Sequence, residues 1–494
     1  MLDERSASWK LLLPGHRRER LLVVGLDAGG VAGLARWWRE VVWVPPSSEA
    51  ARAFESSGCD AREYVAHVRT VTRLDGNGAD YDTIALGAWP NGERPDSAHI
   101  ASLLAPDGAL VSLGFAGSRL TSTELRRLGL NCIRCHAALP ASQPRLYFST
   151  ASRAMRSRGL TFHVPGSRRA RRRVWASRHL STLGLRRHLH HGAVLIAGRN
   201  TNEDARDDLT HWLSQQLGRP LRDLVVYAGS DSPARKLTAL AVADDASDDV
   251  VAKLADTQAA AAAVRREAEA LTALAGTPAA PYVPGLLLEG AWRDCTVQVQ
   301  RCVPSDTLRQ VPKLNAALVR FLVELSHIGR TAMPAHTTAA WQRVERYLQN
   351  AGRGTVPAPV VRCVEQIAHP EIAERHVVCH RTHGDFVPWN VRWHSGQPFL
   401  IDWEESEPSG LALSDACRFA YRQAALVGPW PGGPAMLRTL QTTCNELARR
   451  AGLPSAGIEA ALRLWLLDEH VARTSTHIIE VLDAATGEQP WPAA

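Results

Sequence analysis

Two short segments in the last quarter of the chain carry side chains that could handle a hydroxyl group and a divalent cation. The first is HGDFVPWN, from His383 to Asn390, and the second is FLIDWEES, which places Asp402 twelve residues after Asn390. A carboxylate such as Asp385 can orient an attacking hydroxyl and accept its proton. Asn390 and Asp402 offer the oxygen ligands that Mg²⁺ prefers. The two segments therefore indicate chemistry at a hydroxyl beside a bound Mg²⁺.

The pattern HGDxxPxN followed by a hydrophobic-Asp-Trp motif resembles the aminoglycoside phosphotransferase and choline kinase superfamily, over roughly residues 221–483. Two motifs in the right order arise by chance far less often than one. The resemblance implies ATP and Mg²⁺ as cofactors, Asp385 as the catalytic base, and Asn390 and Asp402 as metal ligands. It also implies a two-lobed, protein-kinase-like α+β domain over 222–494, with a small lobe to about 303 and a large lobe from 304.

Upstream residues match the remaining parts of such a site. Lys253 in VVAKLAD matches the strand lysine that holds the α- and β-phosphates, and Glu267 in VRREAEAL matches the helix glutamate that holds this lysine. Glu269 lies about 200° further round the helix and cannot share that role. We expect both Lys253 and Glu267 to take part in catalysis. His383 and Asp415 are expected to orient the structure instead.

The nucleotide should also meet the phosphate-covering loop and the hinge. GSDSPARK offers only Gly229 where protein kinases use several glycines, and Arg235 and Lys236 could either reach phosphate or stay exposed. The hinge, where backbone groups would meet adenine, is expected near Gln300 and Cys302. These positions complete the cofactor-binding set that the resemblance implies.

The first two hundred residues alternate strand and helix signals. RLLVVGL, VVWV, DTIALGAW, GALVSLG and GAVLIAGR look like strands, and GLARWWREV and SSEAARAFESSG look like helices. Short strands separated by helices predict an α/β fold with a parallel, doubly wound sheet. After a polar connector at 201–221, three segments predict antiparallel strands (RDLVVYAG, KLTALAVAD and DDVVAKLAD). An alanine-rich helix is expected from about 258 to 274, and mostly helices beyond 314.

Three segments of residues 1–200 resemble a class I S-adenosylmethionine-dependent methyltransferase: LLVVGLDAGG, YDTIALGAW and LLAPDGALVSLG. The chain departs from that family at Asp27, where a glycine is expected. Pro45 and Pro46 stand where a carboxylate normally accepts the ribose hydroxyls, which removes a charge-assisted pair of hydrogen bonds. We expect a Rossmann-like, methyltransferase-like domain that serves as a scaffold, with S-adenosylmethionine implied by the resemblance but opposed by these residues. A nicotinamide-binding Rossmann domain is a third alternative, although GxGxxG is not met.

Positive charge is concentrated in one insertion, at about 150–192. The formal net charge is +7, yet residues 125–202 contain no Asp or Glu. Arginines recur there, interleaved with apolar residues and Trp175; five of them are Arg168, Arg169, Arg171, Arg172 and Arg173. This pattern suits an anionic membrane surface or a phosphate-bearing lipid carrier. RNA is less favoured, and a solvated loop is the plain alternative.

Composition points to a cytoplasmic enzyme of two or more domains. The 494 residues contain no apolar stretch long enough to span a membrane, and the first twenty lack the features of a secretory signal. Association with the inner face of the membrane would be peripheral. Nine scattered cysteines favour reduced thiols over a disulfide framework. A zinc site from the CxxC pair is a weaker alternative; its residues would be Cys132, Cys135, His188, His190 and His191.

These observations predict a kinase for a hydroxyl of a sugar or glycan, with a lipid-linked glycan as a narrower alternative. The fusion of a methyltransferase-like domain to a kinase resembles enzymes that modify bacterial surface glycans. A small-molecule kinase for an aminoglycoside or secondary metabolite is the second reading, and a membrane- or RNA-binding adaptor with a vestigial nucleotide site is the third. Three glutamates after Asp402 could bind a cationic acceptor. Three neighbouring arginines argue against one; the two sets are Glu404, Glu405, Glu407 and Arg392, Arg418, Arg422.

Overall fold

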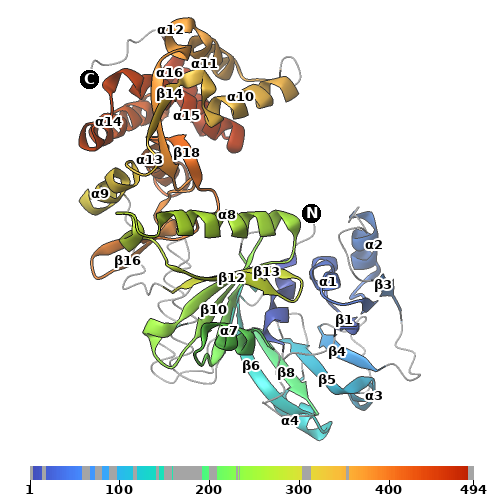
Figure 1. Ribbon diagram of the computed structural model, residues 1–494. Coiled ribbons are helices and arrows are strands. Elements are labelled where there is room, and N and C mark those ends of the chain that lie inside the picture. Colours follow the sequence, from blue (N-terminus) through green and yellow to red (C-terminus); the bar gives the residue numbers. More distant parts are fainter. Residues whose placement is uncertain are drawn as a thin grey trace. The chain divides into compact units, whose positions relative to one another are not determined.

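The chain folds into two compact units (Figure 1), Met1–Val264 with Leu286–Cys302, and Arg265–Gly285 with Val303–Ala494. The computed structural model describes residues 4–13, 18–57, 67–72, 80–87, 97–114, 120–140, 144–149, 158, 192–199, 208–229, 232, 234–302, 313–351 and 355–487. The five arginines of the basic insertion, Trp175 and the three histidines of the zinc alternative lie outside these ranges. The expected division into 1–200, 201–221 and 222–494 stays a prediction.

The first unit is built on one large sheet. Its strands are β1 (Arg20–Val24), β2 (Glu40–Val44), β3 (His67–Thr70), β4 (Tyr81–Leu86), β5 (Leu104–Leu113), β6 (Asn131–Leu139), β7 (Leu146–Ser149), β8 (Gly192–Gly198), β9 (Asp223–Tyr227), β10 (Leu237–Val242), β11 (Val250–Ala255), β12 (Leu286–Trp292) and β13 (Cys295–Arg301). Its helical elements are η1 (Glu4–Leu12), α1 (Ala28–Ala35), α2 (Ser48–Ser56), α3 (Ser97–Ser102), α4 (Ser122–Arg127), α7 (Leu209–Leu217), η6 (Ala246–Asp248) and the start of α8 (Gln258–Leu274).

The sheet runs without interruption through both halves of this unit. Its thirteen strands follow the order β12-β13-β11-β10-β9-β7-β6-β8-β5-β4-β1-β2-β3. Strands β3, β2, β1, β4 and β5 pair in parallel, whereas β8 is antiparallel to β5 and to β6. The junction is the antiparallel pair of β7 and β9, with Tyr147 opposite Val226. The three antiparallel strands predicted after the connector are confirmed as β9, β10 and β11.

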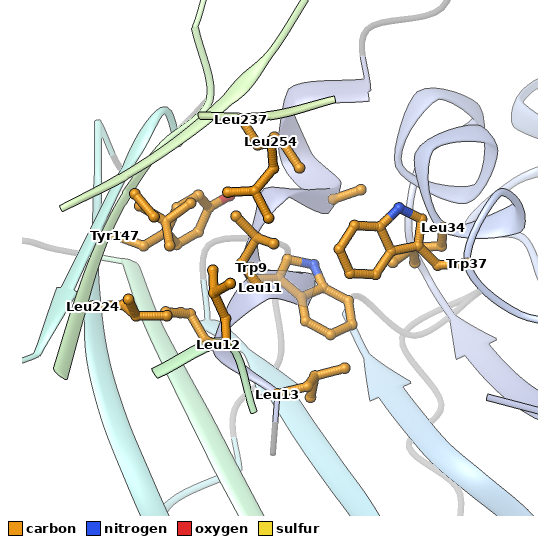
Figure 2. Close-up of a cluster of buried hydrophobic side chains, with 14 of the residues drawn as sticks. Trp9, Leu11, Leu12, Leu13, Leu34, Trp37, Tyr147, Leu224, Leu237 and Leu254 are labelled. Carbon is orange, nitrogen blue, oxygen red and sulfur yellow. The ribbon is translucent and has the colours of Figure 1, made fainter. Parts of the chain in front are cut away.

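The segment η1 packs its apolar side chains into the hydrophobic core formed with residues of this sheet. Trp9, Leu11 and Leu12 are fully buried, and Figure 2 shows them among residues of strands on both sides of the junction, Tyr147 and Leu224 included. Helix α1 approaches η1 closely because it is made of small residues; a Cβ on Gly33 would lie 2.9 Å from the Cβ of Ala7. The first residues of the chain therefore join the two halves into one core.

A buried ion pair fixes η1 in place. The Nζ of Lys10, which is 2% exposed, lies 2.7 Å from Oδ2 of Asp256 and donates to the carbonyl oxygen of Gly33. Burial alone would raise the pKa of Asp256, but Lys10 lowers that pKa from 3.8 to about 2. Because the pKa is depressed in the folded state, the stabilisation is complete above pH 3.8 and is lost as the pH falls through about 2.

One predicted helix is placed wrongly. GLARWWREV was expected to be helical, but α1 begins at Ala28 and ends at Ala35, so Trp37 and Trp38 lie in the connection to β2. The side chain of Asp27 accepts a hydrogen bond from the N–H of Gly30 at 2.7 Å, and this N-cap starts the helix early. Strands β6 and β7 were not expected at all.

The second unit is mainly helical, as predicted. It holds the rest of α8, and then η7 (Ala280–Tyr282), α9 (Ala316–Leu325), β14 (Thr331–Pro334), η8 (Ala335–Thr337), α10 (Ala339–Asn350), α11 (Ala358–Ala368), α12 (Pro370–Ala373), β15 (His376–Thr382), η9 (Pro388–Asn390), β16 (Val391–His394), β17 (Gln397–Leu400), β18 (Glu407–Leu411), α13 (Ser414–Leu426), α14 (Gly433–Ala451), η10 (Ser455–Gly457), α15 (Ile458–Ala472) and α16 (Thr476–Thr486). Two small sheets, β14-β15-β18 and the hairpin β16-β17, lie beside the helices. Within the described ranges, none of the helices combines the length and the apolar character that crossing a bilayer requires.

The ion pair gives a direct test of how η1 is held. Asp256→Asn keeps an oxygen for the indole N–H of Trp37, which donates to Oδ2 at 3.0 Å, but leaves the Lys10 ammonium buried without a counter-charge. The free energy of unfolding should fall by about 3–5 kcal/mol, measured by denaturant titration at pH 7. The double variant Lys10→Met/Asp256→Asn should recover most of that loss. Equal stability of the wild type and Asp256→Asn would contradict the assignment.

Candidate active site

A hairpin brings the two sequence motifs together within the second unit. The loop of residues 383–390 follows β15, and β16 then pairs with β17 so that Val391 lies opposite Leu400. The N–H of Ile401 donates to the carbonyl oxygen of Asn390 at 3.0 Å. Asn390 and Asp402 therefore lie at the same open end of the hairpin, despite the twelve residues between them.

His383 is a buried support for the loop. Its Nδ1 accepts from the N–H of Asp385 at 3.2 Å, and its Nε2 lies 3.1 Å from the carbonyl oxygen of Ile401. These partners require a neutral ring that is protonated on Nε2, because a carbonyl oxygen can only accept. The ring is also 4.5 Å, centroid to centroid, from that of Trp403. His383 is thus committed to holding the loop and has no nitrogen left to act as a base.

Asp415 anchors the start of the same loop. This carboxylate, 2% exposed on α13, accepts from the N–H of His383 at 2.7 Å and from that of Gly384 at 3.1 Å. Gly384 has a φ of 81°, and a Cβ there would overlap the carbonyl oxygen of Glu405. Only glycine fits this backbone conformation and this close approach. The residue before Asp385 is therefore fixed from two directions.

Asp385 and Asn390 are joined by hydrogen bonds. The Nδ2 of Asn390 donates to the main-chain oxygen and to Oδ2 of Asp385, both at 3.0 Å. Since its nitrogen is used in this way, Oδ1 is the atom of Asn390 that suits a cation. The side chain of Asp385 is 26% exposed, so a substrate hydroxyl can reach it.

Asp402 has an unusual backbone conformation. Its φ is 75°, in the left-handed region that residues with a Cβ rarely adopt. The next residue, Trp403, is fully buried, and its N–H lies 3.4 Å from Oε1 of Glu267. The strained position of Asp402 is therefore held by buried neighbours, and such strain commonly accompanies a functional site. Hard oxygen atoms from Asp402 and Asn390 fit Mg²⁺.

The other predicted residues are distributed over both units. Glu267 is fully buried on α8 in the second unit, whereas Lys253 is 5% exposed on β11 in the first unit, opposite Thr238 and Gln298. The pairing of Lys253 with Glu267 stays a prediction.

The predicted nucleotide-binding positions lie in the first unit. Gly229 has a φ of 67°, and a Cβ there would lie 3.1 Å from the carbonyl oxygen of Lys236. Arg235 is committed elsewhere, 2.8 Å from Glu4. Gln300 is 3% exposed on β13. The N–H of Cys302 donates to the main-chain carbonyl oxygen of Asp249 at 3.1 Å. That N–H is engaged within the protein, so a hinge contact at Cys302 would use its carbonyl oxygen.

Sequence reasoning did not find Arg473. Its Nη2 lies 3.5 Å from Oδ1 of Asp385 and 2.6 Å from Oε2 of Glu405, just after the end of α15. Arg473 lies 88 positions after Asp385, and no motif in the sequence connects the two. A guanidinium beside the proposed base can neutralise one of its oxygens and orient the other.

The arginines that seemed to make the acceptor side positive are largely paired. The Nε atoms of Arg418 and Arg422 lie 3.1 and 3.0 Å from the two oxygens of Glu469, which is 1% exposed. Burial opposes the charge of Arg418, but Glu469 and Asp415 raise its pKa above the usual value. These two arginines therefore contribute little net positive charge, and that part of the sequence argument is wrong.

Comparisons with known proteins bear on the second half of the chain. Residues 236–450 match the model of the phosphotransferase enzyme family. No curated protein sequence matches the chain.

Several solved structures resemble parts of the fold at low identity. A thermostable mutant of aminoglycoside phosphotransferase APH(4)-Ia, in a ternary complex with ADP and hygromycin B, has 18% identity and a TM-score of 0.39, over 57% of this chain and 99% of that one. The amicoumacin kinase hAmiN has 13% identity and a TM-score of 0.33, over 50% and 79%. The YcgJ protein of Bacillus has 14% identity and a TM-score of 0.24, over 40% and 99%.

TM-scores this low do not establish a shared fold, so the assignment depends on the family match. The matched range contains all five residues expected to act in phosphoryl transfer: Lys253, Glu267, Asp385, Asn390 and Asp402. The chain is accordingly a phosphotransferase acting on hydroxyl groups, with residues 236–450 as its phosphotransferase-family region.

Proposed function

We propose that the protein uses ATP and Mg²⁺ to phosphorylate a hydroxyl of a neutral sugar or sugar-like acceptor. The observation that carries this proposal is the arrangement of Asp385, Asn390 and Asp402: a partly exposed carboxylate beside two side chains with oxygen ligands at one end of a hairpin. Phosphoryl transfer depends mainly on positioning and on neutralising charge at the transferred group. The side chains present suit both tasks.

Each residue has a separate task in this mechanism. Asp385 orients the acceptor hydroxyl and takes its proton, while Arg473 and Asn390 hold the carboxylate from opposite oxygens. Asn390 Oδ1 and the carboxylate of Asp402 would hold Mg²⁺. When bound, this cation neutralises the phosphate oxygens of the nucleotide. Lys253, oriented by Glu267, would hold the α- and β-phosphates.

The preference for a neutral acceptor rests on the carboxylates near Asp385. Glu405 is paired with Arg473, and Glu469 with Arg418 and Arg422. A polycationic acceptor needs carboxylates that are available to its ammonium groups, and these are already engaged by arginine. A polyhydroxylated neutral molecule needs only hydrogen-bond partners.

The parallel part of the first unit supports a methyltransferase-like, Rossmann-like fold. Strands β3, β2, β1, β4 and β5 run parallel, and β8 enters antiparallel between β5 and β6. We infer a scaffold and not a methyltransferase. The Asp27 carboxylate already caps α1, and β2 ends at Val44, followed by Pro45, with no carboxylate for ribose hydroxyls at that strand end.

Separate tasks for Asp385 and Asp402 predict separable defects. Asp385→Asn should lower kcat by roughly 10²–10⁴-fold, because the amide cannot accept the proton, while calorimetry should show unchanged binding of Mg²⁺ and ATP. Asp402→Ala should instead abolish Mg²⁺-dependent nucleotide binding. Glu446→Gln, an exposed carboxylate paired with Arg450 on α14, is the matched control and should behave as wild type. Near-wild-type turnover by Asp385→Asn would refute its role.

The acceptor preference predicts which compounds are phosphorylated. In a screen with labelled ATP, neutral sugars and glycans should include a substrate, and kanamycin- and gentamicin-type compounds should give no turnover above the ATPase background. If an aminoglycoside is phosphorylated with a kcat/KM on the order of 10⁴ M⁻¹s⁻¹ or more, the protein is a small-molecule kinase of the aminoglycoside type and the sugar hypothesis fails. Absence of ATP turnover with every acceptor, background included, would favour the adaptor reading.

The scaffold reading predicts weak or no binding of S-adenosylmethionine. Calorimetry with the full chain should detect no saturable heat at concentrations of roughly 100 µM, since in the described residues β2 ends without a carboxylate for the ribose and Asp27 already caps the N-terminus of α1. A Kd in the micromolar range would show that the domain retains its cofactor.

A further inference from the structure

The first unit contains a cavity of about 300 Å³ that the phosphotransfer mechanism does not use. Four arginines, two tryptophans, two aspartates and a cysteine line it. They come from the residues before β1, from the connection between α1 and β2, and from the ends of β11, β12 and β13. The cavity thus joins both halves of the large sheet.

Its position differs from that of a cofactor site in a parallel sheet. Arg18 and Arg39 directly precede β1 and β2, so the cavity lies at the amino ends of these strands. The glycine-containing turn and the Asp27 cap lie at the carboxyl ends, where such folds bind their cofactors. This cavity is therefore separate from the crevice of a Rossmann-like domain.

Arg18 lies among three tryptophan rings, and within the described ranges no carboxylate forms an ion pair with it. Its Cζ lies 4.1 Å from the ring centroid of Trp37, 5.5 Å from that of Trp38 and 5.7 Å from that of Trp292. Its Nη2 is buried, and among the described residues it has no hydrogen-bond acceptor. Leaving a buried charged donor unsatisfied is costly. An acceptor supplied by a ligand would remove that cost.

Two further donors in the same place lack acceptors. Trp38 and Trp292 are 1% and 3% exposed, and neither indole Nε1 has a hydrogen-bond partner in the described part of the chain. Trp38 lines the cavity directly. Most buried side-chain donors in proteins are satisfied, so three unsatisfied ones around one guanidinium indicate a missing acceptor.

The nearby acidic groups do not supply that acceptor. Asp256 already takes hydrogen bonds from Lys10 at 2.7 Å and Trp37 at 3.0 Å. Burial raises the pKa of the Cys295 thiol to about 12, so it stays neutral near pH 7. Arg36 is paired with Glu4, Arg39 with Glu19, and Asp256 with Lys10. Among the residues that line the cavity, Arg18 and Arg293 therefore have only the exposed Asp294 as a further carboxylate. The electrostatic potential of the cavity is therefore positive.

Arg293, in the turn between β12 and β13, has an unusual backbone conformation beside the cavity. Arg293 has a φ of 54°, although glycine or asparagine would adopt this conformation with less strain. Burial lowers the pKa of its guanidinium from the ordinary value. The ring of Trp292, whose centroid is 4.5 Å from the Cζ of Arg293, and the neighbouring Asp294 favour its charge, so the turn places a second fixed guanidinium at the wall of the cavity.

We propose that this cavity binds a small oxyanion of the phosphate class, with Arg18 and the indole N–H of Trp38 donating to its oxygens and Arg293 closing over it. The volume accommodates a phosphoryl group with a small organic substituent. The ligand would connect the segment before β1 to the β12–β13 hairpin. Free phosphate and a phosphomonoester share this chemistry.

Calorimetric titration of the full chain with inorganic phosphate and with glycerol 3-phosphate tests the site, without Mg²⁺ and in the Asp402→Ala background. The Asp402 variant removes the metal-dependent nucleotide site, so failure of the proposed phosphotransfer function would not affect the outcome. We expect saturable binding of at least one compound. Equal affinities would identify a free-anion site, and tighter binding of the ester would identify a phosphorylated metabolite.

Two variants and a control locate the binding. Arg18→Gln should weaken binding about tenfold or more, the effect expected from losing a charge-assisted hydrogen bond. Trp38→Phe should weaken it several-fold while leaving Tm unchanged in phosphate-free buffer, because the indole N–H has no hydrogen-bond partner among the described residues. Arg222→Gln removes the same charge from an exposed pair with Asp244, outside the cavity, and should change nothing.

The outcome is decisive even if Arg18→Gln folds poorly, since Trp38→Phe preserves the ring and its packing. The proposal would be overturned if neither compound bound saturably at concentrations up to roughly 10 mM. A Kd above that value corresponds to a binding free energy of less than about 3 kcal/mol. Affinities unchanged in both Arg18→Gln and Trp38→Phe would also overturn the proposal.

Discussion

The position of Asp385, the proposed catalytic carboxylate, depends on a single buried side chain, that of Asp415. It accepts hydrogen bonds from the N–H groups of His383 and Gly384, which would otherwise be buried and unsatisfied. The next N–H in the chain, that of Asp385, is taken by the ring of His383. Three consecutive backbone donors are thus satisfied by side chains, and the loop can turn sharply while remaining rigid. This rigidity lets Asp385 meet a hydroxyl without reorganising.

Charge around this loop is balanced in pairs. Arg473 forms ion pairs with Asp385 and Glu405. Glu469 forms ion pairs with both Arg418 and Arg422. A nearly buried carboxylate such as Glu469 is tolerated because two guanidinium groups compensate for the loss of hydration. The net effect is a site with many charged groups and little net charge in its described part. That field is consistent with selection by hydrogen bonding, and not by attraction of a polycation.

The parts before residue 222 are not attached through a simple linker. Strand β7 pairs with β9, and η1 fills the core on both sides of that junction. The main-chain hydrogen bonds of the pair and the burial of Trp9, Leu11 and Leu12 therefore hold the half before residue 222 against the antiparallel strands that include Lys253. The cavity with Arg18 exists only because these halves meet. Its lining comes from residues nearly three hundred positions apart in sequence.

The sequence by itself determined the type of chemistry and most of the elements. HGDFVPWN and FLIDWEES predicted roles for Asp385, Asn390 and Asp402, because phosphoryl transfer needs oxygen ligands and a base. Hydrophobic patterning located β9, β10, β11 and α8. Local patterns could not reveal the role of η1, since nine residues with one tryptophan and two leucines suit many environments. Arg473, the pairing of Arg418 and Arg422 with Glu469, and the junction of β7 with β9 were decided only by the tertiary structure. Ion pairs and strand pairs between distant segments depend on packing geometry, and no spacing along the chain encodes that geometry.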